Sequence, residues 1–283
     1  MNREDALKQS EQALEELAEA LAQGRSDTLV RYLGMLSRFH QYSFGNCMLI
    51  AIQRPDATHV AGFHRWKELK RYVKKGEKGI FILAPIVRRA KANEEGEARD
   101  DVTDDGKEQT RRVCGFRPVY VFDVTQTEGA ELPEFSRVEG DPGDKVQRLE
   151  SVIRSHGIEL VYEQHLGGAD GRSEGGRIIL REGLPPAEQF AVLAHELGHE
   201  LLHRTERRKE TTRKVRELEA EAVAFVVSKA AGLEGTNHSA DYIQLYAGDK
   251  QLLMESLDHI QRVASSVIEE LSSIGEVADA VAA

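Results

Sequence analysis

The segment His195-Glu196-Leu197-Gly198-His199 constrains this chain most, because it lies in an apolar run long enough for a buried helix. Residues four apart on a helix lie on one face, so the imidazoles of His195 and His199 can bind the same ion. Glu196 is one position round the helix, where it can take a proton from metal-activated water and pass it to a leaving amine. The spacing therefore predicts a helix that carries one zinc ion and the general base of a hydrolase.

The residues around this pattern favour a buried helix over a surface helix with two chance histidines. Leu184-Pro185-Pro186 offers a turn followed by a residue suited to the first helical position. Gly198 is expected to leave room beside the metal. The apolar residues of the predicted helix are Phe190, Val192, Leu193, Leu197, Leu201 and Leu202.

The third metal ligand has to come from another segment. His203 lies eight residues after His195, which is about 12 Å along a helix and too far to share an ion held at about 2 Å. Leu202 and Thr205 stand where a metzincin would have glycine and histidine, so that class is excluded.

A helix predicted from Glu217 to Val227 follows a basic loop and is apolar apart from three acids. Carboxylates on a helix that faces a core need a cation, and a zinc site with two histidines and one glutamate supplies one. Glu217 and Glu221 share a face, whereas Glu219 points elsewhere. One of the pair is expected to bind the metal while the other holds a histidine N–H. A solvated acidic first turn is the alternative, and it explains Glu217 better than Glu221.

The net charge of −10 hides a basic segment. Residues 59–90 contain nine basic and two acidic side chains, so this segment carries +7 and the rest of the chain −17. Cations for phosphates combined with aromatic faces for bases are typical of a groove that binds single-stranded DNA without sequence preference. A recognition helix or zinc finger for duplex DNA is not visible in the sequence. The aromatic residues before and within the basic segment are Phe39, Tyr42, Phe44, Phe63, Trp66 and Tyr72.

The candidate contacts to single-stranded DNA come from this segment and from the stretch before it. A solvated basic face and a packed aromatic core are the alternatives, and packing is favoured for Trp66. The candidates are Arg38, Tyr42, Asn46, Arg65, Trp66, Lys67, Lys70, Arg71, Lys74, Lys75 and Lys78.

The pattern of apolar residues predicts an α+β chain of two domains. The first, residues 1–130, is expected to contain helices and then two strands, 80–87 and 118–124. The polar and acidic residues 91–112 between these strands suggest a mobile tip, which is either a solvated insertion or an imitation of a DNA strand. The glycine- and proline-containing stretch 131–144 is the expected linker. The helices are predicted at residues 5–22, 28–39, 46–53 and 66–73.

The second domain, residues 145–283, is predicted to begin with a helix at 145–155 and strands at 158–162 and 177–180, which lead into the metal-binding helix. Because extended peptides usually pair with an edge strand, the segment 177–180 is the candidate edge for a peptide substrate. The tail, residues 242–271, is expected to be helical and to pack over the active-site helices. Apolar packing is favoured for Tyr242 and Tyr246, although either can reach an oxyanion from there.

The composition, 40% hydrophobic and 30% charged, is typical of a cytoplasmic globular protein. An apolar run long enough to cross a bilayer is missing, and Met1 to Asp5 does not begin a signal peptide, so no membrane partner is expected. Cys47 and Cys114 are not spaced as a metal-binding pair and are expected to be buried free thiols.

Two groups of motifs resemble known families. The segment His195 to His203, with the run Glu221-Ala222-Val223-Ala224-Phe225-Val226, resembles the ImmA/IrrE class of zincin-like metallopeptidases, and this resemblance implies Glu221 as the third ligand. The N-terminal half resembles the single-stranded-DNA-binding domain of ArdC-type antirestriction proteins. This second resemblance rests on the segments Tyr42 to Asn46, Ala61 to Trp66, Val73 to Ile80, Leu83 to Pro85 and Val121 to Gly129.

Two functions are compatible with these features. The first is a peptidase with one Zn²⁺ ion, delivered to single-stranded DNA and acting on an unidentified protein substrate. The second is a non-catalytic antirestriction protein that coats incoming single-stranded plasmid DNA and has a structural or regulatory metal site. Glu196 favours the enzyme, because a structural zinc has no use for a carboxylate beside an open ligand position. The imidazole ligands favour zinc over manganese.

Overall fold

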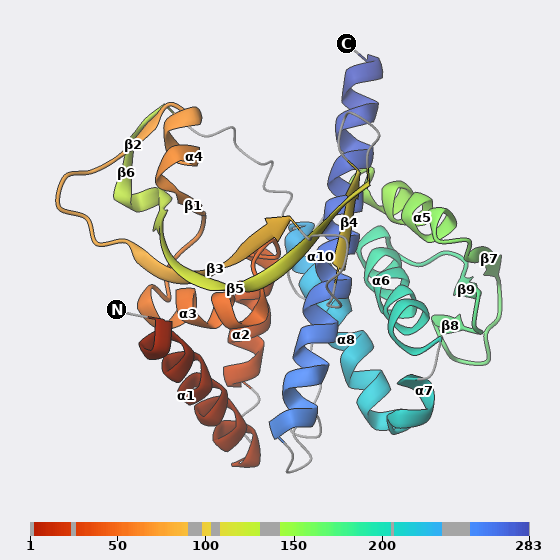
Figure 1. Cartoon of the computed structure of the whole chain (residues 1–283). Coiled ribbons are helices and arrows are strands. Elements are labelled where there is room, and N and C mark those ends of the chain that lie inside the picture. The colour runs from red at the N-terminus through yellow and green to blue at the C-terminus, as the bar shows by residue number, and fades with distance from the viewer. Residues whose placement is uncertain are drawn as a thin grey trace. The chain divides into compact units, whose positions relative to one another are not determined.

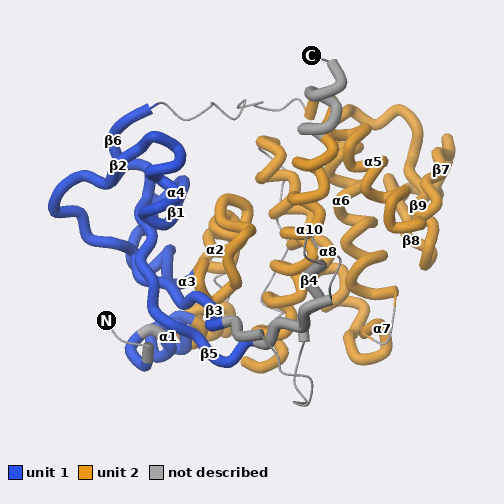
Figure 2. The backbone as a smooth tube through the Cα atoms, turned by 45° about the horizontal axis from the view of Figure 1, so that its top comes forward, with its two compact units in different colours: residues 1–13, 48–132 blue, residues 14–47, 133–283 orange. Residues whose placement is uncertain are grey.

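The structure is a computed structural model (Figure 1), which describes residues 3–23, 27–89, 98–102, 108–130, 142–204, 207–233 and 250–282. The chain divides into two compact units (Figure 2). Each unit combines helices with strands, which confirms the predicted α+β fold of two domains. Unit 1 comprises Met1–Ala13 and Met48–Leu132, and unit 2 comprises Leu14–Cys47 and Pro133–Ala283.

The units do not follow the predicted domain limits at every point. Residues 14–47 fall in unit 2, whereas the predicted domain 1–130 includes them. These residues belong to unit 2 because α2 (Asp27–Arg38) packs against α8 (Arg213–Ala230) of that unit. The predicted limits themselves stay a prediction, and residues 131–141 of the predicted linker lie outside the described residues. Across the part of the chain that the structure describes, no helix is both long enough and apolar enough to span a membrane.

The described residues of unit 1 form two antiparallel sheets. The main sheet has the strand order β1-β5-β3, and β4 also pairs with β5. The strands β2 and β6 form a separate pair. The helices α1 (Arg3–Ala22) and α3 (Phe44–Gln53) run along the chain from one unit into the other. The remaining elements are β1 (Val60–Gly62), α4 (Phe63–Glu68), β2 (Arg71–Val73), β3 (Ile80–Arg89), β4 (Ala98–Val102), β5 (Glu108–Asp123), the 3₁₀ helix η1 (Val124–Gln126) and β6 (Thr127–Gly129).

The first residues of β3 are buried on both faces of the sheet, because Phe81, between Ile80 and Ile82, is buried as well and packs with Leu49 of α3. Ile80 and Ile82 lie on one face of β3 and are buried with Val121 of β5. Gln53, at the end of α3, fastens this sheet: its amide donates to the carbonyl of Phe81 at 2.8 Å and accepts from the Phe81 N–H at 2.9 Å. The expectation of two buried cysteines is wrong for one of them, because Cys114 lies exposed on β5 while Cys47 is buried.

The predicted helix at 66–73 is wrong in its second half. α4 ends at Glu68, Lys70 has a φ of +57°, and residues 71–73 form β2, which pairs with β6. A residue in the left-handed region ends a right-handed helix. The partner strand β6 lies far along the chain, so local periodicity did not reveal it. The basic residues from Lys70 onward therefore lie on a strand and the loop after it, not on one helix face.

The predicted mobile tip at 91–112 is described only in part. Ala98–Val102 forms β4, whose residues pair with Glu108 to Arg112 of β5. Residues 90–97 and 103–107 lie outside the described residues, and the prediction of an acidic imitation of a DNA strand falls largely on them.

In unit 2 a small sheet lies beside the helices, with the strand order β7-β9-β8. β7 and β9 are parallel, and β8 is antiparallel to β9. The prediction that residues 177–180 form an edge strand is wrong, because β9 pairs on both sides. The elements are α5 (Lys145–Ser155), β7 (Glu159–Glu163), β8 (Gly171–Ser173), β9 (Arg177–Arg181), α6 (Pro186–His203), α7 (Arg207–Glu210), α8 and α10 (Lys250–Ala282).

The close crossing of α6 and α8 positions the candidate site. A Cβ atom added at Gly198 would lie 3.2 Å from the Cα of Ala220 and 3.4 Å from the Cβ of Val223. The glycine therefore lets the two helix backbones approach, and its predicted role of leaving room beside a metal stays a prediction. α10 packs against α8, α5 and α6, which confirms the predicted packing of the tail. Tyr242 and Tyr246 lie outside the described residues.

Candidate metal centre and nucleic-acid interface

The helix α6 brings two imidazoles together on one face. Its Pro186 occupies the first helical turn, where the missing N–H has no cost, and most of its apolar residues are buried where it packs against α8 and its other neighbours. The Nε2 atoms of His195 and His199 lie 3.1 Å apart, and both rings are half-buried. The predicted pairing of the two histidines on one helix face is therefore present in the structure.

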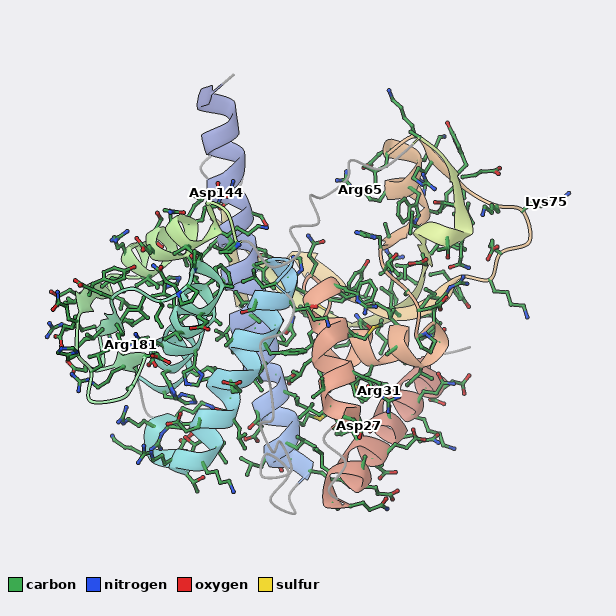
Figure 3. The ribbon with its side chains drawn as sticks, turned by 180° about the vertical axis from the view of Figure 1, so that it is seen from behind. Asp27, Arg31, Arg65, Lys75, Asp144 and Arg181 are labelled. Carbon is green, nitrogen blue, oxygen red and sulfur yellow. The ribbon has the colours of Figure 1, made fainter. Side chains whose placement is uncertain are left out.

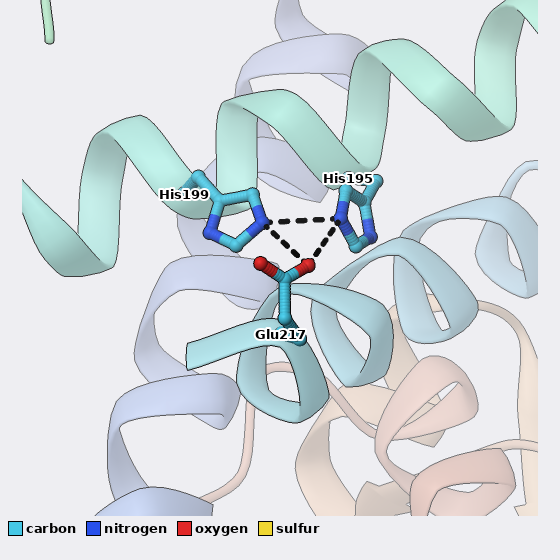
Figure 4. Close-up of side chains that lie close together, drawn as sticks. All are labelled: His195, His199 and Glu217. Carbon is cyan, nitrogen blue, oxygen red and sulfur yellow. Dashed lines mark hydrogen bonds and ion pairs between the residues drawn. The ribbon is translucent and has the colours of Figure 1, made fainter. Parts of the chain in front are cut away.

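Glu217, on α8, faces this pair of nitrogens (Figure 4). Its Oε2 atom lies 3.4 Å from Nε2 of His199 and 3.7 Å from Nε2 of His195. One ligand atom from each of the three residues lies within 4.8 Å of the other two. Two imidazole nitrogens and a carboxylate oxygen around one point are the donor set of a two-histidine, one-glutamate metal site.

Glu221 lies on the other side of the His195 ring. Its Oε2 atom is 3.2 Å from Nδ1 of His195, whereas the nitrogen that faces His199 and Glu217 is Nε2. The structure thus places the two acids in different relations to the histidines, with Glu217 opposite the converging nitrogens and Glu221 behind one ring. The resemblance implied the opposite assignment, with Glu221 as the third ligand.

The charges around the site give the two histidines opposite properties in the absence of metal. Burial disfavours protonation of His195, but hydrogen bonds with Glu217 and Glu221 outweigh it and raise the pKa of His195 to about 9. Burial and the neighbouring His195 charge lower the pKa of His199 to about 4. The hydrogen bond with His195 lowers the pKa of Glu217 to about 2. A pair of charged Glu217 and His195 thus stands beside a neutral His199.

Glu196 is buried next to the strand β8. Burial raises the pKa of the Glu196 carboxyl, with the His195 ring opposing the shift and the charge of Glu217 adding to it. The backbone N–H of Ser173 donates to this carboxylate. A Cβ atom at Gly171 would lie 2.9 Å from Cγ of Glu196 and 2.5 Å from Cγ1 of Val192. Only glycine at this position lets β8 lie so close to the face of α6 that carries Val192 and Glu196.

Glu200 is a buried acid next to the candidate site that the motif does not single out. Its carboxylate accepts hydrogen bonds from Oγ of Ser173 at 2.6 Å, from the N–H of Gly175 at 2.8 Å and from the N–H of Gly176 at 2.6 Å. These bonds hold β8 and the turn after it against α6. Two features of the sequence could have pointed to Glu200. It is an acid inside an apolar helix, four residues after Glu196, and a glycine-rich turn precedes that helix in the chain.

The candidate contacts to DNA are divided between the two units. Arg38, Tyr42 and Asn46 belong to unit 2, and the other eight candidates belong to unit 1. Two of the eight, Trp66 and Arg71, have structural roles. Trp66 is 2% exposed, and its indole N–H donates to the carbonyl of Phe122 at 2.8 Å. The guanidinium of Arg71 donates to the hydroxyl of Thr127 at 2.8 Å and also to the Ala130 carbonyl.

The remaining basic candidates of unit 1 lie on its surface. Arg65 is on α4 and pairs with Glu68 at 3.0 Å, and Lys75 points outward from the loop after β2 (Figure 3). The side-chain nitrogen of Lys74 donates to the carbonyl of Thr125 at 3.0 Å. The exposed basic side chains are Arg65, Lys67, Lys70, Lys74, Lys75 and Lys78.

Unit 1 exposes two aromatic rings of the basic segment and two rings outside it. Phe63 and Tyr72 are 52% and 56% exposed, as a stacking role requires, whereas Phe39 and Phe44 are buried. Outside the basic segment, β5 exposes two more large rings. These are Phe116 and Tyr120, which are 46% and 51% exposed.

Comparison with known proteins identifies the two halves of the chain. Residues 7–122 match the N-terminal domain of the anti-restriction factor ArdC, and residues 153–259 match the IrrE N-terminal-like domain. An uncharacterized protein of Bacillus anthracis is 22% identical over 281 residues, which cover 88% of this chain and 48% of the relative. The chain thus spans about half the length of that curated relative.

Two solved structures of the antirestriction protein ArdC from the R388 plasmid also match. The metal-free structure has a TM-score of 0.47 at 18% identity and covers 82% of this chain and 84% of that one. The Mn(II)-bound structure has a TM-score of 0.49 at 17% identity and covers 93% of this chain and 97% of that one. On the matches of its two domains, the chain belongs to the ArdC type, with an ArdC N-terminal domain followed by an IrrE-like metallopeptidase-type domain.

Proposed function

We propose that this chain is a DNA-associated metallopeptidase of the antirestriction type, which binds single-stranded DNA and hydrolyses peptide bonds in a protein substrate. The observation that carries the proposal is the convergence of His195, His199 and Glu217 on one point, with the buried carboxylate of Glu196 on the same helix. The peptidase activity, the protein substrate and the cytoplasmic location expected from composition all belong to the proposal.

The donor set fits one Zn²⁺ ion. Imidazole nitrogens and a carboxylate oxygen suit zinc, and His199 is neutral at physiological pH and so ready to bind a cation. His195, His199 and Glu217 would hold the ion, and Glu221 would accept a hydrogen bond from Nδ1 of His195 and orient its ring. A bound zinc ion supplies Lewis acidity, which acidifies water and polarises a peptide carbonyl.

Glu196 would serve as the proton carrier. Its pKa is raised by burial, and a carboxyl group whose pKa is raised toward neutrality both accepts and returns a proton efficiently. In this role Glu196 takes a proton from the attacking water and delivers it to the leaving amine. The N–H of Ser173, which donates to the same carboxylate, holds the side chain in place.

The strand β8 would hold the substrate. Among the described strands β8 pairs only with β9, and the N–H of Ser173 reaches Glu196, so the outer edge of β8 borders the reacting position. An extended peptide that pairs with this edge brings its backbone next to the proton carrier. Gly171 and Glu200 support this arrangement, since the first permits the close approach and the second holds the following turn.

Single-stranded DNA would bind unit 1. The exposed lysines of the loop after β2 supply cations for phosphates, and the exposed rings of Phe63 and Tyr72 supply faces for bases. The match of residues 7–122 to the ArdC N-terminal domain supports this assignment. The second candidate function, a non-catalytic protein that coats DNA, is favoured only if the metal site proves to be structural.

A Glu196→Gln variant separates the two functions. The zinc-loaded full chain is incubated with unfolded casein, with and without a single-stranded oligonucleotide, and the peptides are measured by mass spectrometry. Glu196→Gln should keep the zinc and lower the cleavage rate by about 10²- to 10⁴-fold, because the proton carrier is lost. Glu188→Gln, an exposed acid in the first turn of α6, is the matched control and should cleave like the original chain. Equal cleavage by Glu196→Gln would exclude this mechanism.

A further inference from the structure

A buried group of charged side chains adjoins the candidate metal site and takes no part in the function proposed above. Nε2 of His203 lies 2.8 Å from Oε2 of Glu219, and the two side chains are 1% and 0% exposed. The guanidinium of Arg207 pairs with the same carboxylate and approaches Oγ of Ser256 at 3.4 Å. These residues come from four different helices: α6, α8, α7 and α10.

This group touches the metal site through one contact. Nδ1 of His203 lies 3.3 Å from Nδ1 of His199, while Nε2 of His199 faces His195 and Glu217. The spacing of eight residues excludes His203 as a ligand to the ion that His195 binds, but it leaves His203 one turn beyond His199. The contact through Nδ1 therefore joins His203 to the ring nitrogen of His199 that faces away from His195 and Glu217.

The hydrogen-bond partners fix the direction of each proton. A carboxylate only accepts, so Nε2 of His203 carries the hydrogen that goes to Glu219. Arg207 pairs with the same carboxylate, so Glu219 stays an acceptor. A His203 ring that donates through Nε2 offers the lone pair of Nδ1 to His199. Nδ1 of His199 then has to donate, which leaves Nε2 of His199 with the lone pair that a metal requires.

We propose that Glu219 and His203 form a relay of positioning residues that fixes the tautomer and the ring orientation of His199 for metal binding. This inference rests on the proposed metal function of His199. A partner that hydrogen-bonds the free nitrogen of a ligating imidazole raises the affinity of a metal site, because the ligand is held in its binding form before the metal arrives. A merely structural group would tie the four helices together without affecting the binding form of His199.

Two variants of nearly equal shape distinguish the relay from a structural role. Asn and Leu branch at the same atom, but only Asn keeps an oxygen close to the position of Nδ1 of His203. Zinc affinity is measured for the metal-free full chain by competition with a chromophoric chelator, and Tm is measured on the same samples. His203→Leu should weaken zinc binding by about 10- to 100-fold, whereas His203→Asn should stay within a few-fold of the original chain.

Two further variants set the range of zinc affinities against which the variants at His203 are compared. Ser256→Ala removes one hydrogen bond to Glu219 and the approach to Arg207 but keeps the bond between Glu219 and His203, so it should lower Tm and change zinc affinity less than His203→Leu does. His199→Ala should lose the zinc. If the original chain does not bind zinc, the proposed metal function itself fails. If the original chain binds zinc but His203→Asn and His203→Leu weaken it equally, or neither weakens it, the relay alone is wrong.

A measurement on the unaltered chain covers the case in which a variant at His203 does not fold. With ¹⁵N-labelled histidine, long-range ¹H–¹⁵N spectra of the full chain report which ring nitrogen carries the proton. We expect His203 to be protonated on Nε2 in the metal-free and zinc-loaded forms, and His199 to be protonated on Nδ1 in the zinc-loaded form. A proton on Nδ1 of His203 in the zinc-loaded form would overturn the relay.

Discussion

Oε2 of Glu221 lies 3.2 Å from Nδ1 of His195, on the side of the ring that faces away from His199. A carboxylate in this position accepts a hydrogen bond from a metal-bound imidazole and fixes its orientation. Glu221 approaches Nδ1 of His195, whereas Glu217 faces the Nε2 atoms of both histidines. The two acids that share one face of α8 thus approach different nitrogens of His195.

The first prediction separates these two roles. Glu217→Gln should remove a metal ligand and abolish stoichiometric zinc binding, whereas Glu221→Gln should weaken it by only about 10- to 100-fold. Zinc content after dialysis and zinc affinity by chelator competition measure both effects. The two variants change one oxygen each on the same helix face, so each is the control for the other. A larger loss in Glu221→Gln would make Glu221 the ligand.

The second prediction concerns protons released by the metal. His195 has a metal-free pKa of about 9, so it is protonated at neutral pH and has to lose its proton to bind zinc. Its protonation therefore opposes binding below that pKa, and zinc affinity should rise about tenfold per pH unit up to about pH 9. His199, with a pKa of about 4, adds nothing in this range.

Calorimetry in buffers of different ionisation enthalpy counts these protons. We expect release of about one proton per zinc ion at neutral pH. Glu221→Gln removes one of the hydrogen bonds that raise the pKa of His195, so the rise in affinity should end at a lower pH. Zinc binding without proton release would show that His195 is neutral in the metal-free protein.

The third prediction tests the support of β8. Glu200→Gln removes a charged acceptor shared by Gly175, Gly176 and Ser173, and should lower the free energy of unfolding by about 2–3 kcal/mol. Urea unfolding of the metal-free chain gives this value, and the amide hydrogens of Gly175 and Gly176 should exchange faster. Glu188→Gln on the same helix should change stability by less than about 0.5 kcal/mol. Identical unfolding of the two variants would refute a supporting role for Glu200.

The fourth prediction tests the basic loop of unit 1. Lys75 and Lys78 are exposed, and changing both to glutamate should weaken binding to a single-stranded oligonucleotide. If each lysine contacts one phosphate, the slope of log affinity against log salt should fall by about 1.4 in magnitude. The control changes Lys8 and Lys214 to glutamate, because these lysines are exposed elsewhere and the net charge becomes the same. If the two double variants have equal salt slopes, the loop lysines do not contact phosphates and only keep the protein soluble.

The fifth prediction contrasts a stacking ring with a packed one. Tyr72 is 56% exposed, and Tyr72→Ala should cost about 1–3 kcal/mol of binding to single-stranded DNA with little change in stability. Trp66 is buried and bonded to the carbonyl of Phe122, so Trp66→Phe should lower stability by about 1 kcal/mol and leave DNA binding unchanged. Fluorescence anisotropy and urea unfolding measure the two effects. The opposite pattern would place Trp66 in the groove and Tyr72 outside it.

The sequence by itself determined the features that depend on local spacing and composition. Four residues are close to one helical turn, so the pattern from His195 to His199 fixed both the helix and the facing imidazoles. The apolar helix with three acids was visible for the same reason, and the ordered motifs identified both domain families. The helix at 145–155 was also predicted within its observed bounds, because amphipathic periodicity is a local property.

The tertiary structure decided whatever depends on which segments meet. Glu217 and Glu221 are equivalent in the helical pattern, and only the crossing of α6 and α8 at Gly198 directs one toward Nε2 and the other toward Nδ1. The second half of the predicted helix at 66–73 became β2, because a strand more than fifty residues later supplies its partner. Pairing of β9 on both sides and the approach of Glu219 to His203 likewise follow from contacts between distant segments, and spacing along one chain does not encode them.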